Sequence, residues 1–163
     1  MATAGLSDVD VVIKVHPNED FALLRRQVPE WGWPDARFTQ AYDIFRLFAA
    51  ADAAIMVTSM AGIEAMAMGC PVIAVQTPDK DFEGHDMAPY VKEDAVDRVD
   101  LDDPAALRAT LLRVLDNAAA RADLIERGHR FAAKYMRPVD GTLAARLVAI
   151  ADEARAALEA RRG

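Results

Sequence analysis

Short apolar runs rich in β-branched residues alternate along this chain with segments of helical periodicity. The clearest runs are residues 9–16 (VDVVIKVH), 53–58 (AAIMVT) and 71–75 (PVIAV), and the first two precede segments with helix signals. Parallel strands need a crossover connection, usually a helix, whereas antiparallel strands can be joined by a tight turn. The alternation therefore predicts an α/β fold with a mainly parallel, doubly wound sheet and helices on both of its faces.

Capping residues and helix breakers predict where the helices begin and end. Asn18, Asp43 and Asp103 are predicted N-caps, and Gly69 closes the helix that follows the second apolar run. Residues 76–90 lose all periodicity and predict a long polar loop, a kind of segment that often has a function. The predicted helices cover residues 18–27, 44–51, 62–68, 104–117, 120–135 and 142–161, and further short strands cover residues 37–39 and 95–99.

The length of 163 residues suits one α/β domain with a proper core and leaves little room for a second. We expect residues 1–163 to form a single domain in which residues 142–163 are a terminal helix. Its apolar stripe predicts packing on another domain, or self-association when that domain is absent. The residues of this stripe are Leu143, Leu147, Ile150 and Leu158.

Charge and cysteine content exclude several classes of partner. The net charge is −7 and no predicted face concentrates Lys and Arg, so nucleic acid is not expected to bind. Cys70 is the sole cysteine, which excludes an intrachain disulfide and a cysteine-based zinc cluster, and we expect no metal site. No apolar run approaches the roughly 20 residues that a membrane helix needs. We expect a cytoplasmic location, with any contact to the inner membrane face made through a partner.

Polar residues at predicted strand ends indicate a ligand site. In a doubly wound, Rossmann-like sheet, ligands bind beyond the carboxyl ends of the strands. His16 and Ser59 both lie at such ends, so we expect one crevice to receive both, and Pro17 fixes the chain direction beside His16. The imidazole could donate to a phosphate oxygen and stabilise a departing nucleotide. The alternative is a histidine that is satisfied by a backbone carbonyl.

The turn after the second apolar run has the residues of a phosphate site. Ser59 is predicted to cap the following helix by accepting from the N–H three residues on, which leaves other first-turn N–H groups partly free for a phosphate. Glu64, one turn beyond, could accept the hydroxyls of a ribose. The alternatives are a capped helix without a ligand and a carboxylate that complements the helix dipole. The predicted substrate-binding residues are Thr58, Ser59, Met60, Ala61, Gly62 and Glu64.

Two stretches, VVIKVHPNE and DIFRLFAAADAAIMVTSMAGIEAMAMGCPVIAV, resemble the C-terminal domain of GT-B fold glycosyltransferases. The resemblance is to capsule and surface-polysaccharide enzymes related to sialyl-, Kdo- and glycerophosphotransferases, and it covers roughly residues 9–135. In that group one strand ends in His-Pro, and a later strand ends in a Ser/Thr motif ahead of a Gly-x-Glu-Ala helix. The matching residues here are His16-Pro17, Thr58-Ser59 and Gly62-Ile63-Glu64-Ala65.

The resemblance implies that His16 acts in catalysis, that His16 and Ser59 contact the donor phosphate, and that Glu64 faces the nucleotide ribose. The donor is a nucleotide-diphosphate or nucleotide-monophosphate sugar, and no further cofactor is implied. Such enzymes have an extra opening strand with a glycine-bearing phosphate loop, and an N-terminal acceptor domain that supplies the catalytic base. We therefore expect a partner domain or partner chain, and no sugar transfer by this chain alone. The alternatives are part of a UDP-N-acetylglucosamine 2-epimerase-like enzyme and a non-catalytic nucleotide-binding or oligomerisation module.

Overall fold

The fold is α/β with parallel strands, as the sequence predicts. The computed structural model describes residues 8–27, 36–40, 43–57, 59–76, 88–136 and 142–160. The strands are β1 (Val12–Lys14), β2 (Arg37–Thr39), β3 (Ala54–Met56), β4 (Val72–Gln76) and β5 (Asp97–Asp100). The helices are α1 (Phe21–Gln27), α2 (Ile44–Ala50), α3 (Ala61–Ala67), α4 (Pro89–Lys92), α5 (Pro104–Asp116), α6 (Ala118–Tyr135) and α7 (Leu143–Ala160).

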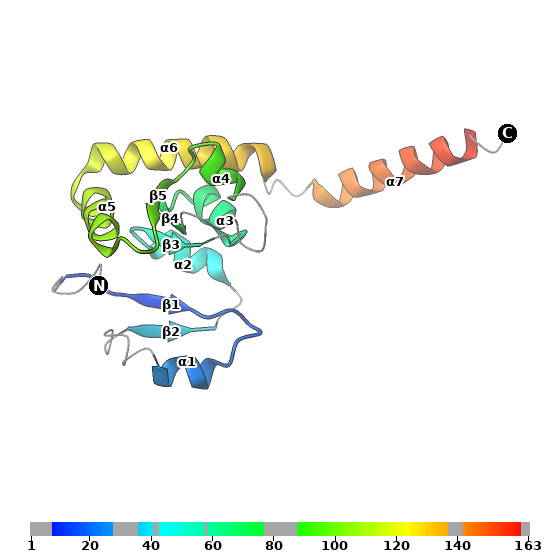
Figure 1. Ribbon diagram of the computed structural model, residues 1–163. Helices are drawn as coiled ribbons and strands as arrows, with labels where there is room; N and C mark the ends of the chain where they lie inside the picture. The colour runs from blue at the N-terminus through cyan, green and yellow to red at the C-terminus, as the bar shows by residue number, and fades with distance from the viewer. Residues whose placement is uncertain are drawn as a thin grey trace.

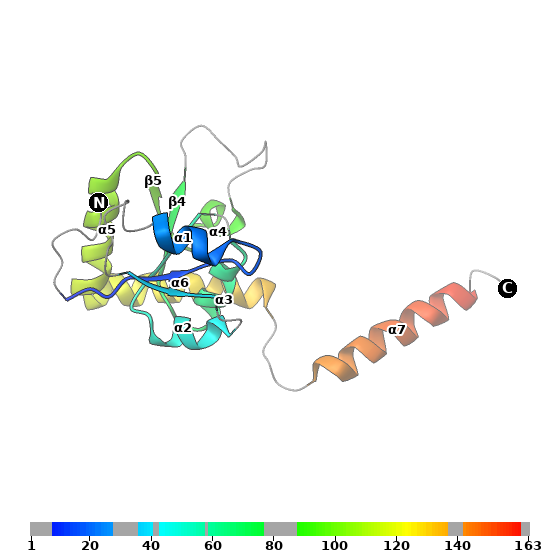
Figure 2. The same ribbon diagram turned by 90° about the horizontal axis from the view of Figure 1, so that it is seen from below.

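The strands form two parallel sheets instead of the single sheet that we predicted. β1 pairs with β2, whereas β4 lies between β3 and β5 in a three-stranded sheet. In Figure 1 the two sheets stand one above the other, with α2 between them in this view. In Figure 2 α1 and α2 project to opposite sides of the β1–β2 pair. Helices therefore flank both sides of this pair, as a doubly wound arrangement requires.

The core is built around β4, and every residue of this strand is buried. Successive side chains of a strand point to opposite faces, so β4 contributes to two apolar clusters. On one face Ala74 packs in a cluster with Met66 of α3, Tyr90 of α4 and Phe131 of α6. On the other face Ile73 packs in a cluster with residues of β5, α5 and α6, namely Val99, Leu111, Val114 and Leu124.

Strands β1 and β3 are less well covered by neighbouring elements than β4. Among the described residues, β1 and β3 each have a strand partner on one side only. Val12, Ile55 and Val57, on or directly after these strands, are between 44% and 48% exposed. α1, β1, β2 and α2 contain no buried residue, although Val15 directly after β1 is buried. Parallel strands are normally covered on both faces, so apolar surface remains here for further packing.

Local capping signals predict the starts of α2 and α5 correctly. Asp43 accepts a hydrogen bond from the Arg46 N–H, and Asp103 accepts one from the Ala106 N–H at 2.8 Å. The prediction that Asn18 caps α1 is wrong, because Asp20 accepts from the Leu23 N–H at 2.9 Å. The predicted loop over residues 76–90 is also too long. Its first residue ends β4 and its last residues begin α4, while residues 77–87 lie outside the described residues.

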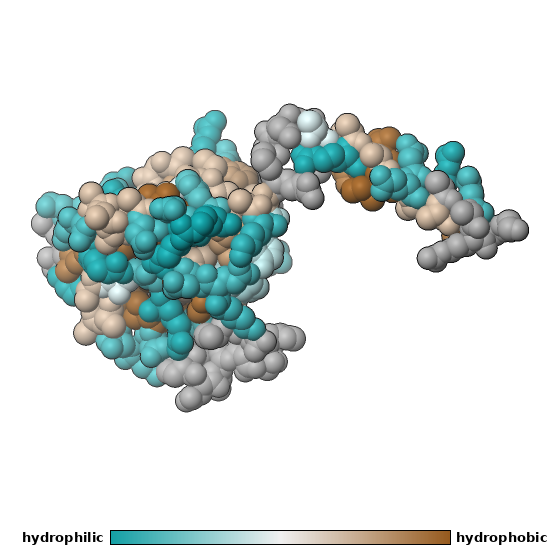
Figure 3. All heavy atoms as spheres, turned by 90° about the horizontal axis from the view of Figure 1, so that it is seen from above, coloured by the Kyte–Doolittle hydropathy of each residue, from teal (hydrophilic) through white to brown (hydrophobic). Residues whose placement is uncertain are grey.

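The terminal helix α7 extends away from the rest of the molecule (Figures 1 and 2). Figure 3 shows apolar side chains along its surface among polar ones. Leu147, Val148, Ile150 and Leu158 are more than half exposed. Leu147, Ile150 and Leu158 of the predicted stripe are therefore unpartnered. The side chain of Leu143, the remaining residue of the stripe, is not described. Across the described helices, none is long and apolar enough to cross a membrane.

Candidate functional site

The turn after β1 presents His16 to solvent, and a side chain from β2 holds that turn. Gln40, the residue after β2, donates through Nε2 to the carbonyl oxygens of His16 at 2.9 Å, Glu19 at 3.1 Å and Pro17 at 3.3 Å. Sequence reasoning missed Gln40, although it directly follows a strand that runs parallel to β1. Because the carboxyl ends of parallel neighbours meet at one edge of a sheet, its position contained a usable signal.

The hydrogen bonding of the His16 ring determines which nitrogen can meet a ligand. Nδ1 accepts a hydrogen bond from the Asn18 N–H at 3.2 Å. In a neutral imidazole the proton then resides on Nε2. This Nε2–H has no partner among the described residues and lies on an exposed side chain. His16 can therefore act as a neutral hydrogen-bond donor beyond the end of β1.

The turn after β3 differs in detail from the predicted helix cap. The Ser59 hydroxyl oxygen accepts from the Ala61 N–H at 3.2 Å, two residues on, and its carbonyl accepts from the Gly62 N–H at 3.0 Å. The Ile63 N–H donates to the Met60 carbonyl at 3.0 Å. The prediction of first-turn N–H groups left free for phosphate is thus wrong for these three groups. What Ser59 can offer a ligand is its exposed hydroxyl hydrogen.

Tyr90 fixes the turn after β3 from inside the fold. This residue is 1% exposed, and its hydroxyl donates to the carbonyl oxygens of Val57 and Ser59, each at 3.3 Å. Burial raises the pKa of Tyr90 to about 12, so the hydroxyl keeps its proton at neutral pH. Sequence reasoning placed Tyr90 at the end of a loop and missed this role, which depends on two segments that are distant in the chain.

The remaining predicted residues of this turn have different environments. Gly62 is buried, and a Cβ there would lie 2.8 Å from the Met56 sulfur and 3.3 Å from the Tyr90 ring, so a side chain at this position would displace Met56. Met60 is 70% exposed, and Ala61 and Glu64 are half-buried. No hydrogen bond or ion pair joins the Glu64 carboxylate to a described residue, which leaves it available to a ligand. Thr58 lies outside the described residues.

The two turns belong to different sheets, so His16 and Ser59 do not lie on hydrogen-bonded neighbouring strands. This corrects the expectation that the two strand ends are adjacent in one sheet. In Figure 1 the chain leaves β1 toward the right-hand side of the molecule, and α3, which follows β3, lies on that side of its own sheet. A single crevice that receives both side chains stays a prediction.

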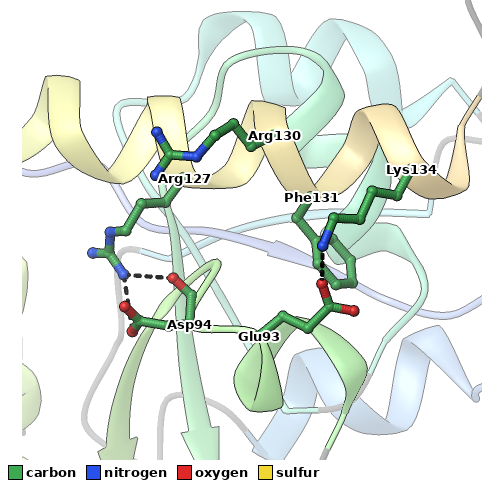
Figure 4. Close-up of a pocket in the computed structure, with 6 residues that line it drawn as sticks. All are labelled: Glu93, Asp94, Arg127, Arg130, Phe131 and Lys134. Carbon is green, nitrogen blue, oxygen red and sulfur yellow. Dashed lines mark hydrogen bonds and ion pairs between the residues drawn. The ribbon is translucent and has the colours of Figure 1, made fainter.

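A hollow of about 210 Å³ lies elsewhere, between α6 and the junction of α4 with β5. Figure 4 shows Arg127 directed toward the carboxylate and backbone carbonyl of Asp94, and Lys134 directed toward the Glu93 carboxylate. Lys134 contacts Glu93, and Arg127 donates to the Asp94 carbonyl at 2.9 Å. The volume is below the roughly 300–1,000 Å³ of typical ligand pockets. The residues that line it are Glu93, Asp94, Arg127, Arg130, Phe131 and Lys134, none of which was a predicted site residue.

The charged side chains of this hollow form ion pairs with neighbouring side chains. Arg127 also donates to Asp97 at 2.7 Å and to Asp123 at 2.9 Å. Burial alone would lower the pKa of Arg127, but these bonds outweigh burial and raise it. Hydrogen bonds from Lys134 and Tyr135 lower the pKa of Glu93. We interpret the hollow as a network of ion pairs that joins α6 to the α4–β5 segment.

Within the part of the chain that the structure describes, no three His, Cys, Asp or Glu side chains are grouped as metal ligands. No protein-family model matches the chain, and no curated protein sequence matches it.

Proposed function

We propose that this chain is the donor-binding half of a glycosyltransferase of surface or capsular polysaccharide synthesis. The observation that supports this most is a pair of exposed hydrogen-bond donors, the His16 imidazole and the Ser59 hydroxyl, each in a turn after a parallel strand. Side chains from elsewhere, Gln40 and Tyr90, hold these two turns. Rigid turns at the carboxyl ends of parallel strands are where α/β sheets bind nucleotides.

In this proposal the two donors bind the phosphate of a nucleotide sugar. The His16 Nε2–H and the Ser59 O–H each donate to a phosphate oxygen. When the bond between the sugar and the phosphate breaks, negative charge grows on the departing phosphate, and donors that are already in place stabilise it. Glu64, in the first turn of α3, accepts hydrogen bonds from ribose hydroxyls and faces away from the phosphate, which its carboxylate would repel.

A partner domain or partner chain supplies the acceptor site and the general base. The incompletely covered strands β1 and β3 and the projecting helix α7 support this part of the proposal, because they expose apolar side chains that a partner would bury. A positioned general base contributes roughly 10²–10⁴-fold to the rate, and acceptor positioning contributes further. We therefore expect this chain to bind donor weakly and to transfer no sugar.

Calorimetry with UDP- and CMP-linked sugars tests the binding proposal. The variants Ser59→Ala and His16→Ala each remove one hydrogen bond to a charged group, so we expect affinity to fall about 10- to 100-fold. Thr110→Ala in α5 and His129→Ala in α6 are the matched controls and should bind like the parent. An exposed hydroxyl with one weak backbone contact adds little stability, so Ser59→Ala should unfold within about 1.5 kcal/mol of the parent.

The outcomes separate the proposed function from its alternatives. If the chain binds no nucleotide sugar, the proposal is wrong and the alternative of an oligomerisation module is favoured. If affinity is the same in Ser59→Ala, His16→Ala and the controls, the donor site lies elsewhere. Turnover by the purified chain with a simple acceptor would show that the base and acceptor site are within these 163 residues. Conversion of UDP-N-acetylglucosamine to its 2-epimer would favour an epimerase.

A further inference from the structure

A buried side-chain amide nitrogen without a hydrogen-bond partner lies at the carboxyl end of the central strand β4. Gln76 is 5% exposed and is the buried polar residue of the core within the described ranges. Its backbone carbonyl accepts from the Leu101 N–H at 2.7 Å, but its side-chain Nε2 has no hydrogen-bond partner. Buried polar side chains are almost always paired, because an unpaired one loses its water without compensation. Gln76 therefore needs an explanation.

The pleat of β4 determines which face Gln76 occupies. Residues two apart on a strand share a face, so the Gln76 side chain lies on the face of Ala74 and Val72. Those two residues pack in the cluster that contains Tyr90 and Met66. The Tyr90 hydroxyl of this cluster donates to two carbonyl groups, and Asp100, which pairs with Gln76 from β5, accepts from Arg98 at 2.9 Å, so neither is bonded to the Gln76 nitrogen.

The register of the sheet places Gln76 next to the Ser59 turn. Met56 of β3 pairs with Ala74, and Gln76 is two residues further along β4. It therefore lies beside the stretch in which β3 gives way to the turn of Ser59. Tyr90, from the same cluster as Ala74, hydrogen-bonds to the Ser59 carbonyl. The unpaired amide thus lies at the carboxyl edge of the sheet, where the proposed donor would bind.

We propose that Gln76 is a substrate-binding residue whose amide donates a hydrogen bond to an acceptor oxygen of the nucleotide-sugar donor. This inference rests on the proposed function. In the free protein the amide is buried without a partner, and the bound donor supplies that partner. A neutral amide adds specificity for oxygen acceptors without adding charge. The site then has three donors, from the carboxyl ends of β1, β3 and β4.

Gln76→Met tests this role, because methionine has a similar length and no polar atoms. A ligand contact predicts two opposite changes in the same variant. The melting temperature should stay the same or rise, since the unpaired amide is removed, while affinity for UDP-N-acetylglucosamine or CMP-N-acetylneuraminate should fall about tenfold. Gln76→Leu is a second variant with the same expectation. Val75→Ala, on the opposite face of β4, is the control that should lower the melting temperature without changing affinity.

Each outcome bears on the inference. Parent-like affinity in both Gln76 variants, beside a parent chain that binds donor, overturns the inference and leaves the proposed function intact. A parent chain that binds neither sugar nucleotide overturns both. Lower melting temperatures in both Gln76 variants would show that the amide is satisfied within the fold, which also contradicts the inference. A tenfold loss of affinity without loss of stability supports it.

Discussion

Gly128 of α6 is the position where one added methyl group should most clearly damage the fold. A Cβ at Gly128 would lie 2.8 Å from the Met66 Cγ, 3.2 Å from its Cβ and 3.4 Å from its sulfur. Met66 is 2% exposed, and its Cβ is fixed to the backbone of α3, so the side chain has little room to move away. The close approach of α3 to α6 therefore depends on the absence of a side chain at Gly128.

Two opposing effects determine the magnitude for Gly128→Ala. Alanine in a helix interior is favoured over glycine by about 0.5–1 kcal/mol. Overpacking of a well-filled core costs about 1–3 kcal/mol, and both the 2.8 Å contact to Cγ and the 3.2 Å contact to the fixed Cβ would have to be relieved. The expected net loss is about 1–2 kcal/mol of unfolding free energy. For a domain of this size, that loss lowers the melting temperature by about 2–8 °C.

Urea unfolding of a double-mutant cycle measures this effect. Met66→Ala removes Cγ and the sulfur but keeps Cβ at 3.2 Å, so the loss caused by Gly128→Ala should be smaller in that background than in the parent chain. Ala122→Gly, at an exposed position of α6, is the control for helix propensity and should cost about 0.5–1 kcal/mol. If Gly128→Ala raises the stability of the parent chain, or has the same effect in both backgrounds, the steric reasoning is refuted.

Two further predictions concern the single cysteine and the terminal helix. Burial, helped by the charge of Asp52, raises the pKa of the Cys70 thiol to about 11, so less thiolate is present at any pH below that value. We expect Ellman's reagent to react slowly at about pH 8 in the folded protein and rapidly in urea; equal rates would contradict the burial. Leu147→Lys with Ile150→Lys should shift any self-association measured by analytical ultracentrifugation toward monomer, because these exposed apolar side chains occupy one side of α7. Val148→Lys, on another side of the helix, is the matched control, and an unchanged distribution in the double variant would exclude this stripe as the contact.

Much of the secondary structure could be predicted from the sequence, because it depends on local interactions. The β-branched runs predict β1, β3 and β4, and Asp43 and Asp103 predict the starts of α2 and α5. A cap contacts an N–H only two or three residues away, so neighbouring residues are enough to recognise it. The same reasoning failed at α1, because Asn18 and Asp20 are equally good capping residues and only the fold selects between them.

The candidate site could be predicted only in part. His16 and Ser59 could be proposed from the sequence, since each lies at the end of an apolar run and strand ends bind ligands in parallel sheets. Their supports, Gln40 and Tyr90, contact residues more than 20 positions away in the chain. The sequence contains no local pattern that pairs such positions. The first-turn N–H groups donate hydrogen bonds to Ser59 and Met60, and this pairing likewise depends on how the turn folds.

Gln76 shows most clearly what the sequence determines and what only the tertiary structure decides. By itself the sequence determined that β-branched residues before it form a strand, and it assigned this polar residue to the loop that follows. The tertiary structure extended β4 to Gln76, because Gln76 pairs with Asp100 of β5. Pairing between distant segments also separated the strands into two sheets and left Val12 and Ile55 exposed. Hydrophobic periodicity reports which residues favour burial, whereas contacts between distant segments decide which of them are buried.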